Sequence, residues 1–327
     1  MSGPQTKPRN SKSKRQALSV WELPKLLRPV HHYRKRELTP CRERPHFRAV
    51  LAFVHRNRFA VASQIQRRFS KYMASDRTAR RHLAELESLG FLDVVDTLNV
   101  GPLWPKVYFV TRRARSRLRQ ALRERGKEWS EPALDRKRTS GVTSHHILHE
   151  LLITELLLMI WEAAQGREDF QLVTIQRRSL LKDNNLELTI TGRRTRLQPD
   201  GVYVSQRISR PPMVTFLEMD LGTMSLKQMT AKFRRYHAWT TSECGSRYLK
   251  AQVSQYGLGR IRMRILVMVA GINPVAEQRR LAQLEKVLKM CPSAIRDRIV
   301  LSTASKFQSQ FSQTISLPCA VSDCRLD

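Results

Sequence analysis

The chain has 327 residues, of which 59 are Lys or Arg and 28 are Asp or Glu, so its formal net charge is +31 at pH 7. This length suits two domains of ordinary size, and a hydrophobic fraction of 41% excludes a chain that is disordered throughout. The excess of positive charge indicates a polyanionic partner, either nucleic acid or an anionic membrane surface, and no apolar run approaches the roughly 20 residues that span a bilayer.

Cysteine usage and the first residues indicate the compartment. The five cysteines are scattered and form no CxxC pair, a pattern typical of reduced thiols and not of a disulfide framework or a zinc site. The N-terminus is polar and basic and lacks the apolar stretch of a secretory signal. We therefore expect a cytoplasmic protein with no membrane partner.

Composition divides the chain into five segments. Residues 1–44 hold 12 Lys and Arg against three Glu, which predicts a disordered basic arm. Residues 45–125 have strong helical periods and form the first predicted domain. Residues 126–143 are polar and read as a linker. Residues 144–304 form a second domain, and the Ser-rich residues 305–327 are expected to be a flexible tail.

The first domain is predicted to be helical, with a two-stranded hairpin before its last helix. Its expected elements, in chain order, are a helix over 45–56, a short strand over 59–61, helices over 63–69 and from 75 or 76 to 89, strands over 91–95 and 107–110, and a basic helix over 112–125. Gly90 ends the third helix, as Gly does just past a helix C-terminus. Residues 96–106 contain Asn, Gly and Pro and suit a hairpin loop.

This order of elements is that of a winged helix-turn-helix, and the segment from Ser75 to Val95 resembles the recognition helix and first wing strand of that family. Apolar residues at i, i+4 and i+7 of the third helix (Ala79, Leu83 and Leu86) face the core. The outer face and first turns then carry five candidate DNA-binding residues, namely Arg77, Thr78, Arg80, Arg81 and His82. Such a helix fits the major groove of B-DNA.

Flanking phosphates are expected to contact Lys106 and the arginines of the last helix. The alternative is a solvated basic helix in a module that docks a protein. The basic excess favours double-stranded DNA as the partner.

The second domain opens with a helix over 144–164 that is apolar almost all round and is therefore buried on several sides. Glu155 lies among its leucines, so it needs a partner, a function or a path to water. His145 and His149 have a spacing that suits zinc, but no acid or Cys completes the set. Hydrogen-bonding or capping histidines are the better interpretation.

The remaining pattern alternates strands and helices around a mixed central sheet. Strands are expected over 170–176, 186–190, 202–204, 213–220, 262–270 and 299–302, and helices over 224–239 and 274–290. In the strand over 213–220, a period of two places Glu218 and Asp220 on the same face. We expect Asp200 to converge with these two acids.

This domain resembles the core of the PD-(D/E)XK nucleases, with Pro199-Asp200 and Glu218 as the matching acids. Carboxylates on neighbouring strands would bind Mg²⁺, which polarises the scissile phosphate and activates a water molecule. The pattern departs from the family because position 220 is Asp instead of Lys. Lys227 and Lys232 lie on the next helix, from which some members of the superfamily take their Lys. The resemblance gives Asp200, Glu218, Asp220 and Lys232 as candidate catalytic residues, with Asp200 and Glu218 as metal ligands and Lys232 supplying positive charge.

The structural alternative is that Asp200 makes a turn before Gly201 and that Glu218 and Asp220 pair with arginines. The PDG turn, the FLEMDLGT strand end and the KFRRY helix, together with the His-bearing apolar helix and the winged helix, resemble the replication-relaxation proteins of plasmids and other mobile elements. That resemblance implies an α+β DNA-binding protein of replication, relaxation or transposition.

Three hypotheses follow. The first is a mobile-element DNA-binding protein whose nuclease-like domain cuts with Mg²⁺, acting as a homo-oligomer on DNA with other proteins of the element. The second is a regulator or accessory factor whose nuclease-like domain is a scaffold or oligomerisation module. The third, an RNA-binding or ribosome-associated basic protein, is disfavoured because only 7% of residues are aromatic and base stacking needs exposed rings.

Overall fold

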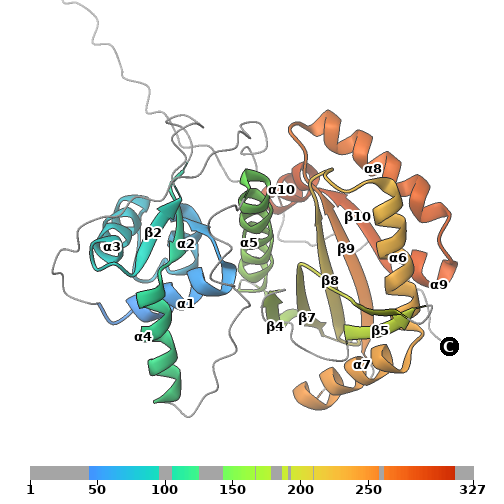
Figure 1. Ribbon diagram of the computed structural model, residues 1–327, viewed down its shortest axis with the longest axis horizontal. Helices are drawn as coiled ribbons and strands as arrows, with labels where there is room; N and C mark the ends of the chain where they lie inside the picture. Colours follow the sequence, from blue (N-terminus) through green and yellow to red (C-terminus); the bar gives the residue numbers. More distant parts are fainter. Residues whose placement is uncertain are drawn as a thin grey trace, which may run out of the picture.

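The computed structural model of the chain describes residues 44–95, 105–124, 143–165, 167–177, 186–190, 193–208, 210–257 and 261–313. These residues form an α+β structure with ten helices, a three-stranded antiparallel sheet, a five-stranded mixed sheet and a two-stranded ribbon (Figure 1). The predicted basic arm up to residue 43, most of the hairpin loop and the predicted linker up to residue 142 lie outside the described residues. Among those described, no helix has both the length and the apolar character needed to cross a bilayer.

The N-terminal unit, residues 44–124, has the order of elements that the sequence predicts. Its elements are α1 (Phe47–Asn57), β1 (Ala60–Val61), α2 (Ala62–Arg68), α3 (Asp76–Ser88), β2 (Leu92–Val95), β3 (Val107–Val110) and α4 (Arg112–Arg123). The three strands pair in the order β1-β3-β2. Ser75 caps α3 by accepting a hydrogen bond from Thr78 N at 3.2 Å, and Gly90 follows its end with φ +68°.

The larger sheet lies between two layers of helices. Its strands are β4 (Phe170–Arg177), β7 (Gly201–Arg207), β8 (Met213–Asp220), β9 (Arg262–Val269) and β10 (Ile299–Thr303), in the order β10-β9-β8-β7-β4. The strands β8, β9 and β10 run parallel, whereas β7 is antiparallel to both of its neighbours. The sheet is therefore mixed, as the alternation of strands and helices predicts.

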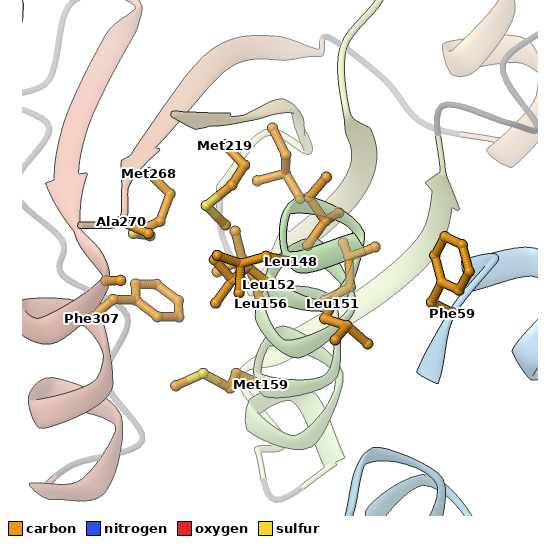
Figure 2. Packing of buried hydrophobic residues seen from close by; sticks show 14 of the residues in the cluster. Phe59, Leu148, Leu151, Leu152, Leu156, Met159, Met219, Met268, Ala270 and Phe307 are labelled. Carbon is orange, nitrogen blue, oxygen red and sulfur yellow. The ribbon is translucent and has the colours of Figure 1, made fainter. Parts of the chain in front are cut away.

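The helix α5 (Ser144–Gln165) stands between the N-terminal unit and this sheet (Figure 1). Figure 2 shows Phe59 of the N-terminal unit on one side of α5, with Met219, Met268 and Phe307 on the other. All of these side chains belong to one buried hydrophobic cluster. The all-round apolar sequence of α5 is thus explained by burial on two opposite sides.

The other face of the sheet is covered by α6 (Leu226–Thr240) and α8 (Pro274–Lys289) (Figure 1). Alternate residues of β8 follow the predicted period of two, so that Val214 and Phe216 pack beneath α6 while Leu217 and Met219 pack toward α5. This division of β8 between the two faces positions Glu218 on the α6 side.

Several elements differ from the prediction. The helix α7 (Glu243–Tyr256) and the short helix α9 (Ser293–Arg296) were not expected, and the strand β5 (Glu187–Ile190) forms a ribbon with an unexpected partner, β6 (Arg193–Arg196), instead of joining the main sheet. The prediction of a flexible tail from residue 305 is wrong as far as residue 313, because α10 (Ala304–Gln313) packs the buried Phe307 against the α5 side of the sheet.

Candidate functional site

Two acids meet where β7 begins and β8 ends. Gly201 pairs with Leu217 across the antiparallel β7–β8 pair, and this register brings the residue before Gly201 beside the end of β8. Asp200 N donates to Leu217 O at 2.9 Å, and Asp200 Oδ2 accepts a hydrogen bond from Met219 N at 2.9 Å. Asp200 is therefore fixed next to Glu218 by backbone contacts on both of its sides.

Asp200 is buried, with 4% of its surface exposed, and it interacts with α5. His149 Nε2 lies 3.3 Å from Asp200 Oδ2. Burial acts to raise the pKa of Asp200, but hydrogen bonding and charge attraction from His149, together with the charge of Lys232, outweigh it and hold this pKa well below its usual range. Burial lowers the pKa of His149, but Asp200 outweighs burial and the net effect raises it.

Glu218 is the more deeply buried of the two acids, with 2% of its surface exposed. Its carboxylate forms an ion pair with Lys232 and accepts a hydrogen bond from Tyr236 Oη at 2.6 Å. Burial raises the pKa of Glu218 to about 7, with the negative charge of Asp200 adding to the rise and Lys232 opposing it. Burial and the neighbouring Glu218 also raise the pKa of Tyr236.

Lys232 and Tyr236 reach Glu218 because they are one turn apart on the same face of α6. The helix is capped by Ser225, whose side chain accepts from Gln228 N at 3.2 Å while Gln228 Oε1 accepts from Ser225 N at 2.7 Å. This reciprocal cap fixes the start of α6 at the end of the loop that follows β8. The sequence prediction that Lys232 and Tyr236 face one site agrees with this geometry.

Asp220 does not converge with the other two acids, contrary to our expectation. Its Oδ2 accepts from Arg280 Nε at 2.7 Å, and its Oδ1 accepts from Gly222 N at 2.9 Å. Arg280 also donates to Met224 O at 2.6 Å. Asp220 thus holds the β8–α6 loop against α8, which is the arginine pairing that the structural alternative predicts for this residue.

The two carboxylates of the site suit a Mg²⁺ ion whose remaining ligands are water and substrate phosphates. Asp200 and Glu218 are two neighbouring carboxylates, and Mg²⁺ in proteins is commonly held by one or two carboxylates with water and substrate phosphates as the other ligands. Among the described residues, no three His, Cys, Asp or Glu side chains gather as a metal cage. His149 and Lys232 provide the positive charge that compensates the two acids.

A second candidate site is the outer face of α3. The side chains of Arg77, Arg80 and Arg81 are exposed and Thr78 is half-buried; Arg80 Nη2 lies 2.5 Å from Asp76 Oδ2. Lys106 is also exposed, at 59%, with its Nζ 3.9 Å from Glu87 Oε2. These positions match the predicted solvent face of the helix.

His82 is the exception on α3, because it faces inward. It is 3% exposed, its ring packs against Phe47, and its Nδ1 lies 3.1 Å from His46 Nε2. The prediction of an outward His82 is wrong because position 82 is three residues after Ala79 and therefore joins the buried stripe of the helix. A side chain buried in this way does not present itself to a ligand on the outer face.

Residues not singled out from sequence join the N-terminal unit to α5. Arg58 of the N-terminal unit lies with its Nη1 3.2 Å from Glu150 Oε1. Arg177 of β4 lies with its Nη2 2.5 Å from Glu150 Oε2, and the same nitrogen donates to Asn57 O of α1 at 3.3 Å. One turn further along α5, Glu155 forms an ion pair with Arg67 and accepts from Gln64 Nε2 at 3.1 Å. The partner that the sequence required for Glu155 is therefore on α2, and only the tertiary contact between α2 and α5 could have revealed it.

The comparison with known families covers both candidate sites. Residues 51–248, more than half of the chain, match the replication-relaxation family. The chain belongs to the replication-relaxation family. The matched region contains α3 and the four side chains of the buried site, namely Asp200, Glu218, Lys232 and Tyr236. Membership implies a role related to plasmid replication and suggests association with DNA. No curated protein and no solved structure matches this member of the family.

Proposed function

We propose that this replication-relaxation protein binds double-stranded DNA through α3, as a winged helix-turn-helix, and acts in the replication, relaxation or transposition of a plasmid or other mobile element. The observation that carries the proposal is the division of α3 into two faces. Ala79, Leu83 and Leu86 are fully buried, whereas Arg77, Arg80 and Arg81 are exposed. A chain with a formal net charge of +31 supplies the electrostatic attraction to phosphate.

The geometry supports base contacts from the first turns of α3. The N-terminal side chains of a recognition helix lie nearest the base edges in the major groove, and Arg77 and Arg81 are four residues apart on this end of the helix. An arginine can form two hydrogen bonds with the edge of a guanine. Lys106, at the start of β3, is suited to a phosphate, which positions the protein without reading sequence.

The test is to select a preferred duplex from a random pool with the full-length protein and then to measure its affinity against a scrambled duplex. Arg77→Ala and Arg81→Ala are each expected to weaken the selected duplex by about 1–3 kcal/mol, and Lys106→Ala to weaken both duplexes alike. Lys289→Ala, an exposed lysine on α8, is the matched control. Equal losses on both duplexes from the two α3 variants would mean that α3 does not read bases.

A second candidate function is Mg²⁺-dependent cutting of DNA, and the pairing of Asp200 and Glu218 beside Lys232 favours it. When bound, Mg²⁺ supplies polarisation of a phosphate and a lowered pKa for an attacking water; Asp200 and Glu218 would hold it. Lys232, released from Glu218, would place positive charge beside the phosphate. Tyr236 orients the Glu218 carboxylate through its hydrogen bond.

Thermal unfolding and a cleavage assay with supercoiled and linear plasmid, each with and without Mg²⁺ or Mn²⁺, test this second function. Binding to the folded state alone raises the melting temperature, and Asp200→Asn is expected to abolish the rise, whereas Lys232→Ala should suppress cutting and preserve the rise. Glu285→Gln, an exposed acid on α8, is the control. No metal-dependent shift and no cutting by the wild type would favour the alternative, a DNA-binding accessory factor whose sheet is a scaffold or an oligomerisation module.

A further inference from the structure

The helix α4 concentrates positive charge on its solvent side. Its 12 residues, RRARSRLRQALR, include six arginines and neither an acidic nor an aromatic residue. Ala114 and Leu118, four residues apart, are buried in the core of the N-terminal unit, so the arginines lie on the other faces of the helix, together with the exposed Ser116 and Gln120. Four of the arginines, Arg112, Arg113, Arg117 and Arg123, are exposed.

The charge of α4 acts against the stability of the N-terminal unit. Arginines at i, i+4 repel one another, and α4 has three such pairs, namely Arg113 with Arg117, Arg115 with Arg119, and Arg119 with Arg123. His55 of α1 experiences the same positive charge, since burial first and then Arg115, Arg56 and Arg119 lower its pKa to about 4. A surface that repels itself in this way is stabilised when a polyanion binds to it.

The start of α4 lies at one end of the β2–β3 hairpin, away from the end that leads to Lys106 and the loop between the two strands. Val95 pairs with Val107 at the end of the β2–β3 hairpin that leads to residues 96–104, and Leu92 pairs with Val110 at the opposite end. The helix α4 begins two residues after Val110, so it starts about 10–13 Å from the Val95–Val107 end, at a rise of 3.2–3.4 Å per residue. In Figure 1 it extends away from the hairpin, on the side opposite to that end.

The arrangement of α3 gives the same result independently. The start of α4 adjoins the C-terminal end of α3, because Thr111 Oγ1 donates to Gly90 O at 2.6 Å. Arg77 lies at the other end of this 13-residue helix, which is about 18–20 Å long at 1.5 Å per residue. A duplex that enters α3 at its first turns therefore does not continue onto α4, which differs from the expectation that the arginines of this last helix hold flanking phosphates of the same duplex.

We infer that α4 is a second DNA-binding surface, which holds the phosphate backbone of a separate duplex segment without reading its sequence, so that one molecule bridges two segments of DNA. This inference rests on the proposed function of α3. Single-stranded nucleic acid is a poorer fit because α4 has no aromatic side chain on which bases stack. A membrane is a poorer fit because, among the described apolar side chains of α4, Ala114 and Leu118 are buried in the core and Ala121 is half-buried, which leaves little apolar surface for insertion between lipids.

The experiment uses the full-length protein and two duplexes of unrelated mixed sequence, each about 40 bp, several helical turns long. One duplex is fixed to beads, and capture of the second, fluorescent duplex from solution measures bridging. The test variant carries Arg112→Gln, Arg117→Gln and Arg123→Gln together. Glutamine has nearly the helix propensity of arginine, and its introduction removes like-charge repulsion, so α4 is expected to stay folded.

The control variant has the same change in charge on the far side of the sheet. It carries Arg279→Gln, Lys286→Gln and Lys289→Gln, three exposed positions on α8. We expect the α4 variant to capture at least about tenfold less of the second duplex, with the log–log salt slope of capture reduced by about 3 for three lost phosphate contacts. The α8 variant should behave as the wild type. Affinity for a single duplex of about 15 bp, little more than one helical turn, should change less than twofold in the α4 variant.

Each other outcome has a definite meaning. Equal capture of the second duplex by the α4 and α8 variants overturns the inference. Such a result would mean that bridging does not need α4 and arises instead from association of two protein molecules. The inference is also overturned if the α4 variant loses as much affinity for the 15-bp duplex as it loses in capture, since α4 would then touch the same duplex as α3. Failure of the wild type to bind any duplex would instead contradict the proposed function itself.

Discussion

The buried carboxyl group of Glu218 predicts a loss of stability as the pH rises from about 5 to about 8. Its pKa is raised from 4.5 to about 7 in the folded protein. Between these two values the unfolded chain has lost a proton that the folded protein still holds, so a rising pH favours unfolding until both states are ionised. A difference of this size corresponds to about 3–4 kcal/mol, because one pKa unit is equivalent to about 1.4 kcal/mol.

The test compares the wild type with Glu218→Gln by urea unfolding at about pH 5 and about pH 8. The tryptophan fluorescence, to which the fully buried Trp239 on the sheet-facing side of α6 contributes, reports unfolding. We expect the wild-type free energy of unfolding to fall between the two pH values by about 3 kcal/mol more than that of the variant. The variant should therefore gain stability relative to the wild type at the higher pH.

The titration of His149 must be separated from that of Glu218, because it also lowers the stability of the folded protein as the pH rises. The raised pKa of His149 gives stability that is present below its unfolded pKa near 6.5 and is lost as the pH rises through the folded value. His149→Asn removes that contribution and leaves Glu218 in place. The reasoning about Glu218 would be refuted if the free energy of unfolding of Glu218→Gln depended on pH as that of the wild type does, while His149→Asn removed this dependence.

Three further predictions concern packing. Phe59→Ala removes a ring that is 3% exposed and should cost about 3–5 kcal/mol, with hydrogen exchange rising in α5 as well as in the N-terminal sheet. Arg67→Met leaves the buried Glu155 without its ion pair and should cost about 3 kcal/mol in urea unfolding. Gly245→Ala should lower the melting temperature sharply, because its Cβ would lie 2.1 Å from Trp239 O.

Matched changes make these outcomes decisive. Tyr72→Ala removes a ring that is 51% exposed and should change stability by less than about 0.5 kcal/mol. Adding Glu155→Gln to Arg67→Met should restore most of the loss, since a neutral amide needs no counter-charge. Faster exchange confined to the N-terminal unit in Phe59→Ala would contradict a core shared through α5, and an unchanged melting temperature in Gly245→Ala would contradict the close approach to Trp239.

The sequence predicts those helices and strands in which apolar residues recur with a single helical or strand period. The stripe of α3 and the alternation of β8 are local patterns, and both are confirmed by burial. The placement of His82 was wrong because a polar ring can complete an apolar stripe when another ring, here His46, accompanies it. The helix α7 was missed because its polar face and Gly245 weaken its period, although Ser242 caps it.

The candidate site was predictable in its acids and less so in their partners. Asp200 and Glu218 stand at recognisable strand ends, and the spacing of Lys232 and Tyr236 places them on one face of α6. The arginine that binds Asp220 lies 60 residues away in sequence, and His149 comes from another layer of the structure. Contacts of that kind are set by the tertiary packing of α5 and α8 against the sheet, which no local pattern encodes.

The two-sided burial of α5 has a consequence for synthesis on the ribosome. The N-terminal unit is complete before α5 emerges, so the side of the helix that carries Leu151 can dock at once. The opposite side, with Leu148, Leu152 and Leu156, waits for β8 and β9 (Figure 2). At 5–20 residues per second, the stretch between the end of α5 and the end of β9 takes roughly 5–20 s to make. During that interval the nascent chain displays a leucine-rich helical surface, which makes α5 the segment of this protein best suited to a chaperone.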